Sequence, residues 1–281
     1  MSGTPVYPAS VNGRILPEEE AGIAPGDEGL LLGLGVFETL AVESGVPLFL
    51  EEHLVRMAEG GRALGLRPTS VDPEAAVRDY LGETGAQRAA LRITWTRGPA
   101  RAGSALVLTA RDLPAAPAEV SLAIAPYRKD AGDPLERVKT VSRARAALAR
   151  ERALARGAFD ALVATTEGDF AEGTVCNLFV ALQGSLRTPP PERGVLPGTV
   201  RKILLASLPL PVREERVRGE DLAVAEEAFV TNSLVGVLPV AAVEGFPRPL
   251  PGAKGRLAGT AAGVYRAAVE RYVRERTGAA L

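Results

Sequence analysis

Strand pairs closed by tight turns are the feature that most restricts how this chain can fold. Residues 35–42 (GVFETLAV) and 46–50 (VPLFL) are rich in β-branched and aromatic side chains and flank a three-residue turn that ends in glycine. Residues 175–181 and 185–188 repeat this arrangement further along the chain. Two strands joined by so short a turn must run antiparallel, so these hairpins exclude a purely parallel sheet.

Helical patterns separate the strands. Residues 51–66 (EEHLVRMAEGGRALGL) place apolar side chains toward one face and begin with two acids, which suit the positive end of a helix. The other predicted helices are residues 72–81, 144–156, 199–207 and 256–274. The alternation of helices and hairpins predicts a mixed α/β (α+β) fold.

The length of 281 residues leaves room for two domains of ordinary size. The segment LPAAPAE, residues 113–119, carries prolines that suit neither a central strand nor a helix interior. We therefore predict an inter-domain linker at 113–119. It would join an N-terminal α/β domain, residues 1–112, to a C-terminal α/β domain with a mixed sheet, residues 120–281.

Composition excludes several classes of function. The formal net charge of −1 offers no field for nucleic acid or an anionic membrane. A single cysteine, Cys176, rules out an internal disulfide framework and fits a reducing compartment. A single histidine, His53, rules out a multi-histidine metal site, and we expect no metal. The N-terminus lacks a signal-peptide pattern, so we expect a cytoplasmic protein.

Lysine is rare in this chain, and Lys139 is the lysine whose surroundings matter for the candidate site. The four lysines are Lys129, Lys139, Lys202 and Lys254, while the other 29 of 33 basic residues (33 − 4) are arginine. Lysine, unlike arginine, can lose its charge when buried and act as an amine nucleophile. The segment RVKTVSRARAA places Lys139 in a short β-like stretch before a helix. Taken alone, this stretch fits a surface lysine better than a catalytic one.

Other segments carry candidate cofactor contacts. Glu172, in AEGTVCNLFV, is either a strand-entry glutamate or a carboxylate that holds a heterocyclic nitrogen protonated. The Pro-Gly turn of GVLPGTVRK opens into a helix at Thr199, where free N–H groups suit a phosphate, although such turns are common. In TNSLVGVLPV, Asn232 and Ser233 form a second phosphate clamp or a simple turn.

Three arginines complete the candidate set. Arg56, in HLVR, lies one helical turn after Glu52, so it forms either a surface ion pair or a phosphate contact. Arg97 and Arg101 share a short loop with glycines and could hold substrate carboxylates or remain solvated.

The order of these motifs along the chain is more specific than any one of them. GVFETL, HLVR, TRG, VKT, AEGTVCNLFV, GVLPGTVRK and TNSLVGVLPV together resemble the fold-type-IV enzymes that use pyridoxal 5'-phosphate, the class IV aminotransferase family. That family includes branched-chain aminotransferases, D-amino-acid aminotransferases and 4-amino-4-deoxychorismate lyases. The resemblance implies a two-domain fold of the D-amino-acid aminotransferase type and a homodimer that acts on a small molecule.

The resemblance also implies roles for individual residues. Lys139 matches the lysine that carries the cofactor covalently and moves protons, and Glu172 matches the partner of the pyridine nitrogen. Arg56 matches a phosphate ligand. The remaining matches are phosphate contacts, namely the loop N–H groups of Thr199 and Val200 and the turn residues Asn232 and Ser233.

Within the family the motifs look most like the lyases. Ala144 stands where branched-chain aminotransferases usually have a tyrosine, and Arg143 matches an arginine of the lyase pattern. These features imply the lyase that forms 4-aminobenzoate and pyruvate in folate biosynthesis, with Arg97 or Arg101 on a substrate carboxylate. The alternatives are a branched-chain or D-amino-acid aminotransferase and, third, a non-catalytic homologue that binds the cofactor. Departures from the family pattern occur at Glu28, Leu34, Ser142 and Val200. We expect Lys129 to be dispensable.

Overall fold

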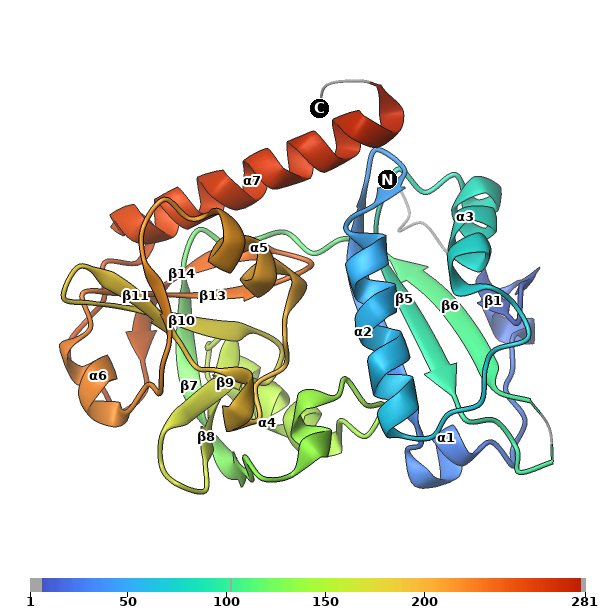
Figure 1. Ribbon diagram of the computed structural model, residues 1–281, viewed down its shortest axis with the longest axis horizontal. Helices are drawn as coiled ribbons and strands as arrows, with labels where there is room; N and C mark the ends of the chain where they lie inside the picture. Colours follow the sequence, from blue (N-terminus) through green and yellow to red (C-terminus); the bar gives the residue numbers. More distant parts are fainter. Residues whose placement is uncertain (1–6, 102, 279–281) are drawn as a thin grey trace. The chain divides into compact units, whose positions relative to one another are not determined.

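The computed structural model describes residues 7–101 and 103–278, and its chain divides into two compact units (Figure 1). Unit 1 contains residues 1–114, 138–142 and 269–281, and unit 2 contains residues 115–137 and 143–268. The first crossing, between Pro114 and Ala115, falls inside the segment predicted as a linker. The two later returns to unit 1 have no counterpart in the predicted continuous domains.

Unit 1 is built on an antiparallel sheet of six strands in the order β2-β1-β6-β5-β3-β4. The strands are β1 (Ala9–Val11), β2 (Arg14–Leu16), β3 (Gly35–Glu43), β4 (Val46–Pro47), β5 (Arg88–Thr96) and β6 (Ala105–Arg111). The helices are η1 (Glu18–Glu20), α1 (Glu28–Leu32), α2 (Leu50–Ala63) and α3 (Pro73–Thr84). The hairpin of β3 and β4 confirms the antiparallel pairing predicted for residues 35–50.

Local signals explain where the helices of unit 1 begin and end. Asp72 accepts a hydrogen bond from the Ala75 N–H, and Pro73 occupies the first turn of α3, where its missing donor is not needed. Gly85 ends α3 in the left-handed conformation. The apolar faces of α2 and α3 pack on the sheet with Leu40, Leu91 and other buried side chains.

Unit 2 contains a mixed sheet of eight strands in the order β12-β11-β10-β13-β14-β7-β8-β9. The strands are β7 (Val120–Lys129), β8 (Asp160–Thr165), β9 (Phe170–Gly173), β10 (Asn177–Leu182), β11 (Ser185–Thr188), β12 (Val212–Glu214), β13 (Glu227–Asn232) and β14 (Gly236–Val243). Three neighbouring pairs are parallel, namely β11 with β12, β14 with β7 and β7 with β8. The predicted mixed α/β fold is therefore confirmed.

The longer helices of unit 2 pack against this sheet. The helices of this unit are η2 (Pro134–Arg137), α4 (Ala144–Ala155), η3 (Pro191–Arg193), α5 (Thr199–Ser207), α6 (Gly219–Val224), η4 (Gly252–Lys254) and α7 (Arg256–Thr277). α7 begins in unit 2, and its residues from Val269 onward belong to unit 1. Within the described residues, no helix combines the length and apolar character that a membrane crossing requires.

Two glycines in helices of unit 1 differ in the space around them, which makes a matched test of packing. A Cβ at Gly61, in α2, would overlap the ring of Trp95, while a Cβ at Gly82, in α3, would meet open space. We expect Gly61→Ala to lower the free energy of unfolding by about 1–3 kcal/mol because the core is overfilled. Gly82→Ala should raise it by about 0.5–1 kcal/mol through helix propensity. Urea denaturation measures both, and equal effects would contradict the packing of α2 on β5.

Candidate functional site

Lys139 belongs to the short segment of residues 138–142 that lies against strand β3 in unit 1. The Lys139 carbonyl accepts a hydrogen bond of 2.9 Å from the Phe37 N–H, and the Val141 N–H donates to the Gly35 carbonyl at 2.9 Å. The Lys139 Nζ lies 4.8 Å from the centre of the Phe37 ring. The backbone of this segment is thus fixed to the sheet, and the side chain is only partly exposed.

Arg56 reaches from α2 into a buried cluster of charged side chains. Its Nε and Nη2 donate to Glu38 Oε1 and Oε2 at 2.7 and 2.6 Å, a bidentate pair. Glu38 comes from β3 and is completely buried. The second partner of Glu38 is His53, whose Nδ1 lies 2.7 Å from Oε2. Arg56 therefore forms its bidentate pair with Glu38 of strand β3.

The pKa values in this cluster follow from burial and charge. Burial alone would raise the pKa of Glu38, but Arg56 and the hydrogen bond from His53 lower it to about 2. Burial lowers the pKa of His53, and the charges of Arg56 and Lys139 act in the same direction. Glu38 is thus ionised, and it holds the guanidinium of Arg56 in one orientation.

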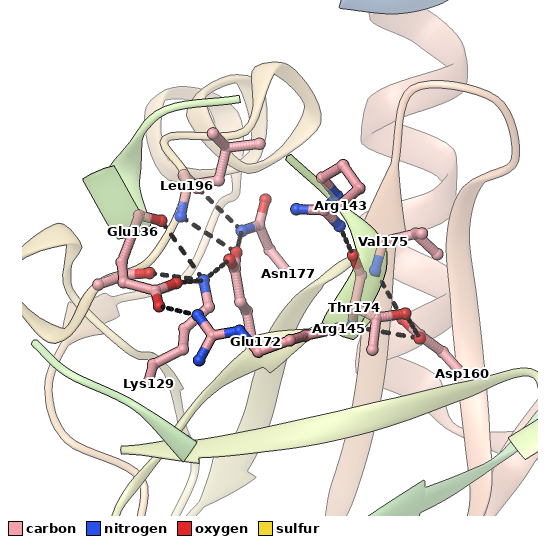
Figure 2. Close-up of polar contacts among 11 residues, drawn as sticks. Lys129, Glu136, Arg143, Arg145, Asp160, Glu172, Thr174, Val175, Asn177 and Leu196 are labelled. Atoms are coloured by element: carbon pink, nitrogen blue, oxygen red, sulfur yellow. Dashed lines mark hydrogen bonds and ion pairs between the residues drawn. The ribbon is translucent and has the colours of Figure 1, made fainter. Parts of the chain in front are cut away.

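Glu172 is the buried acceptor of a second polar cluster, which lies in unit 2 (Figure 2). It lies on β9, and its Oε1 accepts from Lys129 Nζ at 2.6 Å. Its Oε2 accepts from Asn177 Nδ2 at 2.9 Å and from the Leu196 N–H at 3.1 Å. Asn177 Nδ2 also donates to the Leu196 carbonyl at 2.9 Å, so the carboxylate, β10 and the loop before α5 form one network.

Lys129 is a residue that sequence reasoning missed. That it is dispensable for activity stays a prediction, but its side chain is only 7% exposed and pairs directly with Glu172. The scarcity of lysine singled out Lys139 and gave no reason to prefer Lys129. The contact depends on the pairing of β7, β8 and β9, which no local pattern reveals.

The N-terminus of α5 has the form of an anion site. Gly198 is its N-cap residue, and no described side chain caps the helix, so its first N–H groups point outward. A Cβ on Gly198 would overlap the Asn177 side chain, so the turn approaches Asn177 closely only because residue 198 is glycine. Val200 packs into the core with Leu204, so only its backbone N–H remains for a ligand.

The turn after β13 lies beside the same strand that carries Asn177. Thr231 is paired with Asn177 in the sheet, and its buried Oγ1 has no hydrogen-bond partner among the described residues. Asn232 Oδ1 accepts from the N–H groups of Leu234 and Val235 at 3.0 and 3.1 Å. The Asn232 side chain thus shapes the turn that presents Ser233.

A tight turn follows Glu172, and a buried carboxylate holds this turn in place. Asp160, buried at the start of β8, accepts from the Val175 N–H at 3.1 Å, from Cys176 Sγ at 2.9 Å and from Thr174. Arg143 donates to the Thr174 carbonyl, which joins the start of α4 to this turn. Burial raises the pKa of the Cys176 thiol well above its usual value, so the thiol is neutral and unreactive.

The predicted substrate arginines lie in a loop of unit 1 that a third arginine supports. Arg97 Nε is 3.3 Å from Glu28 Oε2 and 40% exposed, so Glu28, a departure from the family pattern, is its ion-pair partner. Arg101 is exposed. Arg67 donates to the carbonyls of Arg97, Pro99 and Ala100 at 3.0, 2.8 and 3.1 Å. Arg67 therefore stabilises the loop, although no sequence motif marked it.

The predicted site residues thus fall into two groups. Lys139, Arg56, Arg97 and Arg101 belong to unit 1. Glu172, Thr199, Val200, Asn232 and Ser233 belong to unit 2. In unit 2 the buried carboxylate, the uncapped helix and the turn after β13 are linked through Asn177.

Comparison with known proteins identifies the family. The model of the amino-transferase class IV family matches residues 35–243. A Methanocaldococcus jannaschii protein named as a branched-chain-amino-acid aminotransferase is 27% identical over 84% of this chain and 87% of its own length. The aminodeoxychorismate lyase of Bacillus subtilis is 25% identical over 83% and 86%. The protein is a member of the class IV aminotransferase family.

A solved structure supports the same conclusion. The crystal structure of 4-amino-4-deoxychorismate lyase from Pseudomonas aeruginosa has a TM-score of 0.76 and 28% identity, and the match covers 96% of this chain and 99% of that one. The predicted fold-type-IV architecture is therefore confirmed. The relatives include both lyases and aminotransferases, and they are similar to this chain at comparable identities.

The family uses pyridoxal 5'-phosphate, and the residues of unit 2 fit this cofactor. The buried carboxylate of Glu172 suits a protonated ring nitrogen. The uncapped N-terminus of α5 suits a phosphate, and the unpartnered hydroxyl of Thr231 is a further donor on the neighbouring strand.

The Glu38 cluster predicts a specific dependence of stability on pH. The pKa of Glu38 falls from 4.5 to about 2 on folding, so its ionised form stabilises the fold above about pH 5, and this contribution is lost as the pH falls toward 2. We expect Glu38→Gln to unfold more easily than the wild type near neutral pH. The difference in unfolding free energy should shrink by about 2 kcal/mol between pH 6 and pH 3.

Glu43 is the matched control, because it lies on the same strand but pairs with the exposed Arg88. Glu43→Gln should change the unfolding free energy by less than about 1 kcal/mol at either pH. Urea titrations at the two pH values make the comparison. A Glu38→Gln difference that stays constant with pH would show that the Glu38 carboxylate is not held ionised by Arg56.

Proposed function

We propose that this protein is a pyridoxal-phosphate-dependent 4-amino-4-deoxychorismate lyase, which forms 4-aminobenzoate and pyruvate in folate biosynthesis. The observation that carries this choice is the pair Arg143-Ala144 at the start of α4. Branched-chain aminotransferases usually have a tyrosine hydroxyl at position 144, and here only a methyl group is present. Arg143 is bound to the turn that follows Glu172, which gives the lyase-type arginine a fixed place.

Five groups of the chain would hold the cofactor. Lys139 would bind it covalently, and Glu172 would accept a hydrogen bond from its ring nitrogen. Arg56, the N–H groups of Thr199 and Val200, and the turn of Asn232 and Ser233 would bind its phosphate. Glu38 supports this assignment, because it orients the Arg56 guanidinium. When bound, the cofactor supplies an electron sink that stabilises negative charge on the substrate carbon.

The chain's own part in the reaction is mainly proton transfer. The Lys139 amine would remove the proton from the amine-bearing ring carbon of the substrate, acting as general base. It would then deliver a proton to the methylene carbon of the enolpyruvyl group, after which pyruvate leaves and the ring becomes aromatic. Glu172, held by three donors, would keep the ring nitrogen protonated throughout.

Substrate recognition would fall to the loop that Arg67 supports. Arg97 or Arg101 would bind a carboxylate of the substrate, since a guanidinium matches a carboxylate in shape and charge. Arg97 already has an anionic partner in Glu28, which favours the more exposed Arg101 for this contact.

The second candidate is a branched-chain or D-amino-acid aminotransferase. The similarity to the Methanocaldococcus jannaschii relative favours it, and it would use the same Lys139 to move a proton between substrate and cofactor carbons. A non-catalytic homologue that binds the cofactor is the third candidate. It is disfavoured because Lys139 and Glu172 are both retained.

Turnover assays on purified protein test the proposal. We expect release of 4-aminobenzoate and pyruvate from 4-amino-4-deoxychorismate, and no amino transfer from glutamate or D-alanine to a panel of keto acids. Lys139→Ala should fold normally and lose all turnover, because in the proposed mechanism the Lys139 amine carries out both proton transfers. Borohydride reduction of the wild type should attach the cofactor to Lys139, as mass spectrometry of the peptides would show.

Lys254→Ala is the matched control, because Lys254 is exposed in η4 and has no part in the proposed site. It should retain full turnover. Amino transfer to a branched keto acid without release of 4-aminobenzoate would establish the second candidate. Absence of label on Lys139 would exclude both enzymes.

We also propose a cytoplasmic homodimer, as the family resemblance implies. The leucines of α1 offer an apolar surface for it, because Leu30, Leu31 and Leu32 are 60%, 63% and 67% exposed within unit 1.

Sedimentation velocity tests the dimer. The wild type should have twice the mass of one chain, and the double variant Leu31→Asp, Leu32→Asp should dissociate at low micromolar concentration. Leu154→Asp, at an exposed position on α4, is the control and should remain dimeric. A monomeric wild type would refute the dimer, and a dimeric double variant would place the interface elsewhere.

A further inference from the structure

Lys129 is a buried lysine at the end of β7 that the mechanism above does not use. Its Nζ lies 2.6 Å from Glu172 Oε1, 2.8 Å from the Gly194 carbonyl and 3.4 Å from the Glu136 carbonyl. An ammonium group has three N–H donors, and here each has an acceptor. The side chain is therefore fixed in position.

The sheet makes the contact between Lys129 and Glu172 rigid. In the strand order β7-β8-β9, the two residues lie on the strands that flank β8. Lys129 is paired with Thr165 of β8, and Glu172 is paired with Val163. Because paired strands hold both backbones, the ion pair does not depend on a loop.

A row of alternating charges explains how the ammonium group is tolerated in this buried place. Figure 2 shows the contacts of Glu136 with Arg145 and with Lys129, and the contact of Lys129 with Glu172. Arg145 Nη2 is 3.1 Å from Glu136 Oε1, and Glu136 Oε2 is 3.5 Å from Lys129 Nζ. Only Arg145 is well exposed, so the row leads from solvent to the buried carboxylate.

The acceptor positions of Glu172 show what Lys129 leaves available. A carboxylate has about four acceptor positions, two on each oxygen. Asn177 and the Leu196 N–H fill the two on Oε2, and Lys129 fills one on Oε1. One position on Oε1 remains.

We propose that Lys129 is a positioning residue, which fixes the Glu172 carboxylate so that its remaining acceptor position meets the ring nitrogen of the cofactor. The proposal rests on the proposed function, because it takes Glu172 as the partner of that nitrogen. Without Lys129 the buried carboxylate loses its cation and one of the contacts that hold it in place. The ring nitrogen then loses a fixed acceptor.

The test compares two probes that differ only at the ring nitrogen. The dissociation constants of pyridoxal 5'-phosphate and of its 1-deaza analogue, which has carbon in place of that nitrogen, are measured on the cofactor-free full chain. The wild type should bind the natural cofactor about tenfold or more tightly than the analogue, because a hydrogen bond to a charged group contributes that much to affinity. Lys129→Met should reduce this preference below about threefold and leave the affinity for the deaza analogue unchanged.

A double-mutant cycle shows whether Lys129 acts through Glu172. Glu172→Gln should lose the preference, and adding Lys129→Met to it should change nothing further. Lys254→Met, at an exposed position, should match the wild type. Circular dichroism confirms that each variant is folded before binding is measured.

Each other outcome has a definite meaning. A wild-type preference in Lys129→Met, or an equal loss of affinity for both probes, would overturn the positioning role. A wild type without any preference would instead refute the assignment of Glu172 in the proposed function. The wild-type preference tells the two failures apart, because it is present in the first case and absent in the second.

Discussion

A carboxylate that is buried away from water needs fixed hydrogen-bond donors around it. Each unit of this chain buries one such carboxylate at the candidate site. In unit 1, Arg56 and His53 hold Glu38, and the ionised Glu38 in turn holds the arginine proposed for the phosphate. In unit 2, Lys129, Asn177 and the Leu196 N–H hold Glu172. These donors lie on strands, helices and a loop whose positions the apolar cores fix. The polar clusters therefore depend on the packing of the cores.

Local sequence patterns predicted the elements of this fold better than their partners. The hairpin of β3 and β4 was visible because a turn joins two β-rich runs directly. The helix α5 was visible because a Pro-Gly turn precedes Thr199. Short elements such as β1, β9 and α6 were missed, because three to six residues carry too little periodicity to be recognised. The return of residues 138–142 to β3 was missed because pairing across about one hundred residues leaves no local signal.

The candidate site shows the same division. Lys139, Glu172 and Arg56 could be chosen from motifs, because the motifs keep a recognisable order along the chain. Their structural partners could not be chosen this way. Glu38 was visible only as part of a β-rich run, and Lys129 seemed dispensable, because the contact of each depends on which strands become neighbours. The residues proposed to bind the cofactor were therefore easier to select from the sequence than the residues that contact them.

The chain passes between the two units four times, at 114/115, 137/138, 142/143 and 268/269. Lys139 therefore belongs to unit 1 although its codon is flanked on both sides by sequence for unit 2. A chimera that joins residues 1–114 of one relative to the rest of another would inherit its lysine segment from the second parent. That segment must then fit a β3 strand from the first parent, where Gly35 and Phe37 bind its backbone. Recombination in this family should succeed best when strand β3 and the lysine segment are exchanged together.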